Sequence, residues 1–173
     1  GNGIDPTTRS NALVMLKSGR VGLGLNTPQY RLDLPNTANT LGQARANAWL
    51  TYSDGRVKTN NRPIPYGLQT VMALRPQQYE HHSSTFVNGR LVLDAAGPAA
   101  TRIGFVAQDL AHVVPEAATA PADAETDLWA VDYTALVPVL VRALQEQQAQ
   151  IESLQATVNQ QATQLQHLTG QRP

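Results

Sequence analysis

Three short apolar runs in the first 35 residues predict a β-rich segment. The runs are residues 12–16, 21–25 and 30–34, separated by Lys17-Ser18-Gly19 and Asn26-Thr27-Pro28. Short apolar runs between turn residues favour strands over helices. Two or three short strands are marginally stable unless they pack on another element, so we expect this segment to pair with other chains. Residues 36–50 have no strong period and predict a linker, or a short helix around residues 44–49.

The middle of the chain alternates between helical and extended patterns. A helix is predicted over residues 66–74, and Arg75-Pro76 ends it because proline cannot continue a helix. A strand then fits residues 78–81. The helix is expected to carry one apolar face made of Leu68, Val71, Met72 and Leu74.

The next segment contains the clearest local signal, a hairpin. Asn88-Gly89 lies between the two extended halves of residues 86–93 and suits a type I′ turn. Residues 103–107 predict another strand, followed by a short helix over residues 108–114 that stops before Pro115 and a loop over residues 117–127.

A heptad pattern predicts a long C-terminal helix. Position a is taken by Val137, Leu144, Ile151, Val158 and Leu165, and position d by Leu140, Gln147, Leu154, Gln161 and Leu168. Every a position is therefore apolar, as in a coiled coil. Pro138 must lie near the start of this helix or kink it.

The apolar stripe leaves two interpretations open. A stripe at helical spacing is more often the core of its own domain than an interface between chains. Five heptads, however, make a helix about 50 Å long, which is longer than the diameter of a domain of about 80 residues. We therefore favour self-association. Glutamine at two d layers costs stability but can fix register and oligomeric state.

Composition and charge narrow the possible partners. Thirteen Lys and Arg balance thirteen Asp and Glu, so no basic surplus indicates a nucleic acid or an anionic membrane. Cysteine is absent, which excludes disulfides, thiolate metal sites and cysteine nucleophiles. No run approaches the roughly 18 to 20 apolar residues of a membrane-spanning helix, and Gly1-Asn2-Gly3 does not resemble a signal peptide. We expect the chain to be a piece of a longer protein.

Residues 53–58 contain a candidate nucleophile and base. If Asp54-Gly55 forms a two-residue hairpin, Ser53 lies opposite Arg56, and Lys58 becomes its diagonal neighbour at about 7 to 8 Å. A Ser-Lys dyad is then geometrically feasible. To act as a base, Lys58 must be neutral near pH 7, which requires burial or a neighbouring cation such as Arg56. A short polar segment of this kind is otherwise an ordinary turn.

Other candidate chemistry is weaker, and we expect no metal and no cofactor. The histidines are His81, His82, His112 and His167, which show no standard metal spacing. The acids Asp109, Glu116, Asp123, Glu125 and Asp127 could suggest a carboxylate pair, but acids in a Pro-Ala loop are usually solvated. Gly22 and Gly24 lack the strand-to-helix setting of a phosphate loop.

A series of short motifs follows Tyr52 in a fixed order. It runs through Ser53-Asp54, Arg56, Lys58-Thr59-Asn60, Pro63-Ile64, Ala73-Leu74-Arg75-Pro76, Tyr79, Ile103-Gly104-Phe105-Val106-Ala107-Gln108-Asp109, Val114-Pro115-Glu116 and Val131-Asp132-Tyr133-Thr134-Ala135-Leu136-Val137-Pro138. This series resembles the peptidase S74 family, the C-terminal intramolecular chaperone domain of phage endosialidases, tail fibres and related bacterial fibre proteins. The glycine-punctuated run at residues 21–34 is similar to the repeats that precede this domain in fibre stalks.

The resemblance implies a homotrimer that folds the β-rich fibre before it and then cuts the chain in front of the motif serine. Carried over to this sequence, it implies that Ser53 is the nucleophile, Lys58 the base and Tyr52-Ser53 the scissile bond. The partners are then further copies of the chain and the upstream stalk of the same chain. The resemblance also implies a phage-like virion tail or a bacterial cell surface.

These observations together predict an α+β protein in three parts. Residues 1–50 form a β-rich stalk end and linker, residues 51–131 a compact α+β domain, and residues 132–173 a helix in a parallel trimeric coiled coil. The predicted function is an intramolecular chaperone that trimerises and may cleave itself once. The first alternative is the same trimer left uncleaved as a structural end cap. An adhesin tip is weaker, because aromatic residues make up only 5% of the chain.

Overall fold

The computed structural model describes residues 13–170, so residue 12 of the first predicted strand lies outside the described part. The chain divides into two compact units that interleave along the sequence. The first unit comprises residues 1–54, 76–104 and 120–129, and the second comprises residues 55–75, 105–119 and 130–173. Among residues 13–170, no helix combines the length and apolar character needed to cross a bilayer.

The first unit opens with a small three-stranded sheet. Its strands are β1 (Val14–Met15), β2 (Val21–Gly22) and β3 (Leu32–Asp33), with β2 in the middle. β1 and β2 pair antiparallel, whereas β2 and β3 pair parallel. All three predicted strands are thus present, but each is only two residues long.

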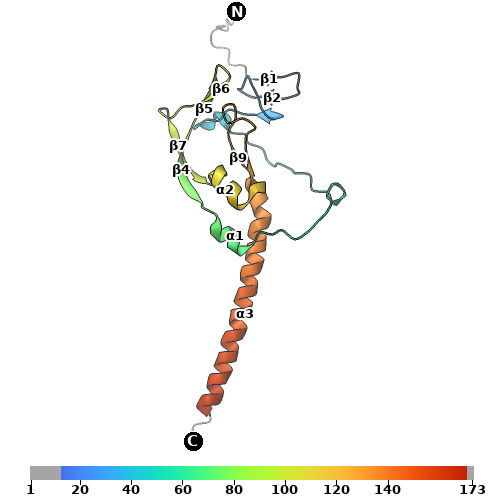
Figure 1. Cartoon of the computed structure of the whole chain (residues 1–173), viewed down its shortest axis with the longest axis vertical. Coiled ribbons are helices and arrows are strands. Elements are labelled where there is room, and N and C mark those ends of the chain that lie inside the picture. The colour runs from blue at the N-terminus through green and yellow to red at the C-terminus, as the bar shows by residue number, and fades with distance from the viewer. Residues whose placement is uncertain (1–12, 171–173) are drawn as a thin grey trace, which may run out of the picture. The chain divides into compact units, whose positions relative to one another are not determined.

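Two further strand pairs complete the first unit (Figure 1). β4 (Gln77–His82) pairs antiparallel with β7 (Ala99–Gly104) over six residue pairs, from Gln77 opposite Gly104 to His82 opposite Ala99. β5 (Ser84–Val87) and β6 (Arg90–Leu93) form the predicted hairpin. Its turn has φ of 51° at Asn88 and 79° at Gly89, the positive values that a type I′ turn requires.

The first unit has almost no apolar core of its own. Pro28 and Gly22 are its only buried residues among those described, while Met15, Leu23 and Leu32 stay exposed. Polar bonds hold the pieces together instead, because Asn36 O accepts from Ser84 N at 2.9 Å and Arg90 pairs with Glu125 at 3.1 Å. A unit with so little buried apolar surface gains little stability from burial within one chain.

The second unit contains the hydrophobic core. It consists of α1 (Leu68–Ala73), α2 (Ala107–Val113), the β8–β9 pair (Ala118–Thr119 with Ala130–Val131) and α3 (Leu136–Gly170), with 3₁₀ turns at Gly55–Val57, Pro115–Ala117 and Tyr133–Ala135. The buried cluster is formed by Leu110, Val114, Ala117, Leu136 and Val139. Val114 and Val139 are only 1% and 2% exposed. Residues from α2 and the start of α3 therefore build one core.

α3 begins at a well-defined cap. The Asp132 side chain accepts hydrogen bonds from Thr134 N and Ala135 N, which satisfies donors at the start of the 3₁₀ turn leading into α3. Pro138 is the third residue of α3, where its missing N–H would have no partner in any case, so it is compatible with a regular helix.

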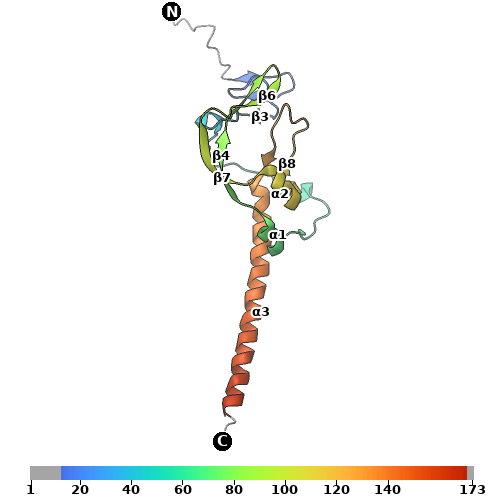
Figure 2. The same ribbon diagram turned by 60° about the vertical axis from the view of Figure 1, so that its left-hand side comes forward.

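α3 extends far beyond the elements that it contacts. It has 35 residues, about 50 Å at 1.5 Å per residue. Figures 1 and 2 both show α1 and α2 beside its first turns, and every residue from Gln147 to Thr169 is exposed. The predicted C-terminal helix is confirmed, and most of its length touches no other described part of this chain.

Three local predictions need correction. Residues 44–49 form no helix, and a 3₁₀ turn lies earlier, at Thr40–Gly42. The strand expected at residues 103–107 ends at Gly104, because Ala107 already begins α2. The loop expected at residues 117–127 begins with the strand β8. An unbroken apolar run cannot by itself separate the end of a strand from the start of a buried helix.

The predicted apolar face of α1 also changes. Leu68, Val71 and Leu74 are half-buried, but Met72 is 74% exposed. Leu68 and Val71 lie at i and i+3 of this six-residue helix, and Leu74 is the residue that ends it. Met72 lies about 100° around the axis from Val71. Met72 therefore points away from the core of its own chain.

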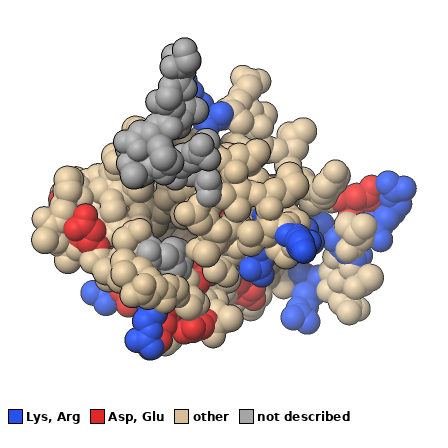
Figure 3. Space-filling view, turned by 90° about the horizontal axis from the view of Figure 1, so that it is seen from above, with Lys and Arg blue, Asp and Glu red and all other residues tan. Residues whose placement is uncertain are grey.

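Charges of both signs occur together on one face of the molecule. On the face that Figure 3 presents, Lys and Arg side chains are interspersed with Asp and Glu. This arrangement matches the balanced charge of the sequence.

Candidate functional site

The segment from Ser53 to Lys58 forms a 3₁₀ turn instead of the expected hairpin. Residues 50–54 are irregular, Gly55–Val57 is a 3₁₀ helix, and Lys58 N donates to Gly55 O at 3.2 Å. Neither Asp54 nor Gly55 has a positive φ, which a type I′ turn needs at both central residues. The predicted opposition of Ser53 and Arg56 on paired strands is wrong, because no strands flank Asp54-Gly55.

Ser53 and Lys58 lie on the two sides of this turn along the chain. Ser53 belongs to the end of a segment of the first unit, and Lys58 follows the 3₁₀ turn in the second unit. Both side chains are exposed, and Tyr52 is fully exposed. A lysine acts as a base only in a surrounding that favours its neutral form. The burial that this chemistry requires is therefore not provided within the single chain.

Several motif residues form ties within the second unit. Arg75 and Asp109, 34 positions apart, approach to 3.9 Å. The Tyr133 hydroxyl accepts a hydrogen bond from Phe105 N at 3.2 Å, and the two rings lie 6.1 Å apart. These residues join α1 and the start of α2 to the segment that leads into α3. These four motif residues thus have structural roles within the second unit.

Tyr66 and Glu116 form another such tie. Tyr66 Oη donates to Glu116 Oε2 at 2.6 Å. This hydrogen bond lowers the pKa of Glu116 below its ordinary value of 4.5 and raises the pKa of Tyr66 above 10.0. The bond fixes the approach to α1 against the 3₁₀ turn at Pro115–Ala117. Sequence reasoning did not predict this pair, since fifty residues separate its members.

The lowered pKa of Glu116 predicts a pH-dependent stability. A carboxyl group whose pKa is lower in the folded state stabilises the fold above its unfolded value and loses this contribution as pH falls through the folded value. We expect Tyr66→Phe to lower the melting temperature at pH 7 by a few degrees at most, because the pair is solvent-exposed. Calorimetry from pH 7 to pH 3 checks this.

The quantity to follow is the difference in melting temperature between wild type and the variant, because other carboxyl groups also change the stability in this pH range. The gap in melting temperature between wild type and Tyr66→Phe should close as pH falls below 4.5. A gap that stays constant from pH 7 to pH 3 would show that the hydrogen bond does not stabilise the fold.

Glu146 is a further structural residue that the sequence analysis missed. Its Oε2 accepts from Leu68 N at 2.8 Å, and its Oε1 accepts from Arg142 Nε at 3.0 Å. The Glu146 carboxylate thus accepts from a backbone N–H at the N-terminus of α1 that has no partner within the helix. Its negative charge also interacts favourably with the positive end of the helix dipole. A Cβ on Gly67 would collide with this carboxylate. The only sequence signal was a helix preceded by glycine, with no side-chain cap.

The heptad stripe of α3 is separate from the core of the second unit. Leu136, Val139 and Ala143 are buried against the chain's own core, and none of them occupies an a or d position. The a residues Val137 and Ile151 are instead 56% and 48% exposed. The interpretation that the stripe packs onto its own domain is wrong in this structure.

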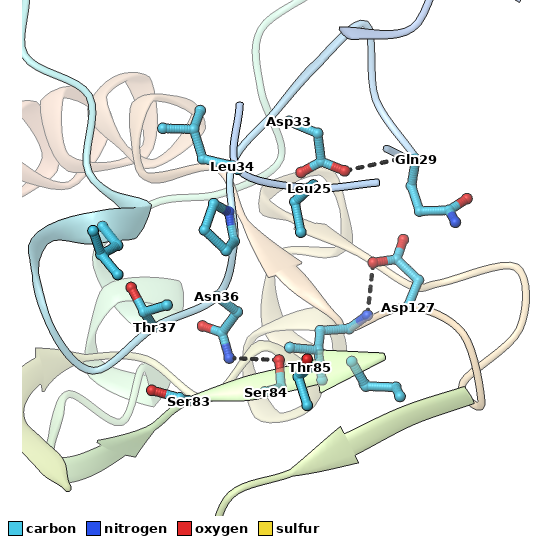
Figure 4. A pocket seen from close by; sticks show the side chains of 15 residues that line it. Leu25, Gln29, Asp33, Leu34, Asn36, Thr37, Ser83, Ser84, Thr85 and Asp127 are labelled. Atoms are coloured by element: carbon cyan, nitrogen blue, oxygen red, sulfur yellow. Dashed lines mark hydrogen bonds between the residues drawn. The ribbon is translucent and has the colours of Figure 1, made fainter. Parts of the chain in front are cut away.

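A hollow of about 390 Å³ lies in the first unit (Figure 4). Asn36 Nδ2 donates to Ser84 Oγ at 3.0 Å, and Asp33 Oδ2 accepts from Gln29 N at 2.8 Å. Asp127 also lines it and accepts from Leu128 N at 2.8 Å. The Asn36–Ser84 bond joins the segment after β3 to β5, whereas the other two bonds are local. Within the described part of the chain, His, Asp and Glu residues form no metal-binding group.

The family comparison covers the motif series from Ser53 to Glu116, and the last block, residues 131–138, lies outside it. Residues 53–119 match the model of the Peptidase_S74 family, which is described as the chaperone of endosialidase. The resemblance to the peptidase S74 family is confirmed. We refer to residues 53–119 as the S74 region. No curated protein matches the chain.

The C-terminal limit of the S74 region coincides with the end of a strand. It starts at Ser53, the residue after the predicted scissile bond, and ends at Thr119, the last residue of β8. It therefore includes Lys58, α1, the hairpin and α2, and excludes α3. The match supports the family assignment for the Ser53–Lys58 segment, while the heptad stripe is independent of it.

Proposed function

We propose that this chain is an intramolecular chaperone that associates as a parallel homotrimer through α3 and folds a β-rich fibre stalk. After folding, it releases itself by autoproteolysis between Tyr52 and Ser53. The observation that carries the proposal is the separation of the two faces of α3. One face completes the chain's own core, and the other exposes an apolar residue at every a position.

The sparse core of the first unit supports the stalk-folding part of the proposal. Apolar residues such as Met15 and Leu32 are 74% and 49% exposed, and the strands that carry them have two residues each. Three such segments brought together could bury one another. A trimeric helix that forms from local contacts holds the three stalk ends at high effective concentration while they pair.

The chemistry of release requires only groups of this chain and water. Ser53 Oγ attacks the carbonyl carbon of Tyr52 while Lys58 Nζ accepts the hydroxyl proton. The bond between the Tyr52 carbon and the Ser53 nitrogen then breaks, and the nitrogen gains a proton and leaves as an amine. Water hydrolyses the resulting ester, which restores the Ser53 hydroxyl and leaves a carboxylate on Tyr52.

The exposure of Ser53 and Lys58 gives a second candidate a specific basis. Neither side chain is buried in the single chain, so a domain whose lysine stays solvated in the assembly would not cut. That domain would remain as an uncleaved trimeric end cap. Both candidates place the protein on a phage-like virion tail or a bacterial cell surface.

The oligomeric state tests what the two candidates share. Light scattering at micromolar concentration is expected to report three chains per particle, because one exposed apolar stripe per helix can be buried in a three-helix seam. A monomer, or an antiparallel dimer in a crystal, would contradict the proposed architecture.

A further inference from the structure

The segment around Ser53 and Lys58 carries large apolar side chains that the single chain leaves in water. Residues 43–63 are all exposed, and apart from the 3₁₀ turn at Gly55–Val57 they contain no helix or strand. The large apolar residues of the segment are Trp49, Leu50, Tyr52 and Val57, with exposures of 70%, 95%, 100% and 75%. We call these four residues the apolar set.

Two members of the apolar set are held beside the proposed dyad by the covalent chain. Tyr52 precedes Ser53, and Val57 precedes Lys58. Because consecutive Cα atoms are only about 3.8 Å apart, both side chains stay near the dyad in any arrangement of the segment. The turn between them is open as well, since a Cβ on Gly55 would meet no atom within 4 Å beyond its chain neighbours. The single chain therefore leaves the dyad and its apolar neighbours uncovered together.

The charges of the segment already favour a neutral lysine. Residues 43–63 contain four basic residues and one acid, which are Arg45, Arg56, Lys58, Arg62 and Asp54. Neighbouring cations and removal of water both favour the neutral amine, whereas the single acid acts in the opposite direction. The cations are present in the single chain, so the condition that assembly has to add is apolar cover.

We propose that the side chains of the apolar set are positioning groups for the cut. When the trimer assembles, they are buried against a neighbouring chain and exclude water from the Lys58 amine. Their own chain does not cover them, and burial of their apolar surface is favourable, which offsets the cost of dehydrating the amine. This inference rests on the proposed autoproteolysis and deepens it, because it names the residues that make cleavage depend on assembly.

The pH profile of the cut tests this role. Val57→Ser removes apolar cover beside Lys58 and admits water. We expect the cleavage rate near pH 7 to fall about tenfold and to recover about one pH unit higher, because a hydrated amine loses its proton only at higher pH. Val57→Ile keeps the apolar cover and should keep the wild-type profile. A variant that only weakened the fold would cut more slowly at every pH, without a shift of the profile.

Trp49 reports the burial of the apolar set without any cleavage. The chain has two tryptophans, so Trp129→Phe leaves Trp49 as the single reporter. Ser53→Ala is added to prevent the cut, and the trimer is compared with the same chain carrying Ile151→Asp, which light scattering has to show as a single chain. We expect emission at shorter wavelength and weaker quenching by acrylamide in the trimer, because the indole leaves water.

Val92→Ser is the matched control for the pH profile. Val92 is a valine with 44% exposure that lies outside the segment, so this change should leave the rate and the profile as in wild type.

The outcomes separate this inference from the proposed function. A trimer that cuts with the same pH profile in wild type and Val57→Ser, or in which Trp49 stays as accessible as in the single chain, overturns the positioning role and leaves the proposed function intact. A verified wild-type trimer that does not cut at any pH contradicts the proposed autoproteolysis, and the positioning role with it.

Discussion

Ile151→Asp is expected to abolish the trimer. Ile151 is the central a residue of α3, and its side chain is 48% exposed in the single chain. In a parallel trimer, the variant buries three carboxylates in one layer. Each costs several kcal/mol unless it becomes protonated. Light scattering and thermal melting measure the loss, which should be partly reversed at low pH.

A matched control places the same charge on the other side of the helix. Ala156 is at the outward f position of the same turns, so Ala156→Asp should leave the trimer and its melting temperature close to wild type. If Ile151→Asp also leaves both unchanged, the heptad stripe is not the interface, and the association has to be sought elsewhere in the chain.

Ser53→Ala is expected to abolish the autoproteolytic product while the trimer still forms. Wild-type protein should yield a fragment of residues 53–173, visible on a denaturing gel and identified by its N-terminal serine. Removal of the hydroxyl removes the nucleophile, and Lys58→Ala removes the base, so each change alone should stop the cut. Ser53 and Lys58 are exposed, so neither change should disturb the core.

Thr51→Ala supplies the control for this experiment. It removes a hydroxyl two positions before Ser53, and the fragment should appear as in wild type. Mixed trimers of Ser53→Ala and Lys58→Ala chains then tell whether the lysine acts on its own chain or on a neighbour. A wild-type chain that stays intact as a verified trimer after prolonged incubation would favour the uncleaved end cap.

The same requirement predicts when the proposed cut would occur. A lysine serves as a base only in a surrounding that favours its neutral form, and Lys58 is exposed in the single chain. Burial by neighbouring chains would favour the neutral amine, so cleavage should follow assembly. The cut would separate the stalk from residues 53–173, which include the trimerising helix α3. A stalk that unfolded after this loss could not readily refold, so its stability would be kinetic.

Two glycine-containing turns show where local sequence was sufficient and where it was not. Asn88-Gly89 adopts the predicted type I′ turn because alternating residues on both sides pair as β5 and β6. Asp54-Gly55 has similar chemistry but lacks such strands, and its segment closes into a 3₁₀ turn. The dipeptide permits the turn, while the pairing of its flanks decides whether it forms.

The sequence by itself determined the elements whose signals are local. The long C-terminal helix and the stop at Arg75-Pro76 could be predicted directly, because periodicity and proline act within a few positions. The motif series of the S74 region is likewise visible in the residue order alone. The heptad pattern also identified the apolar a and d residues of α3, which are exposed in the structure.

Only the tertiary structure decided which surfaces are already covered within the chain. Met72 could belong to the core face or outside it, and the stripe of α3 could pack on its own domain or remain open. Both questions depend on contacts between segments distant in sequence, such as Leu110 with Leu136 and Leu68 with Glu146. Hydrophobic spacing shows which residues favour burial, but their partner is set by how the whole chain closes its core.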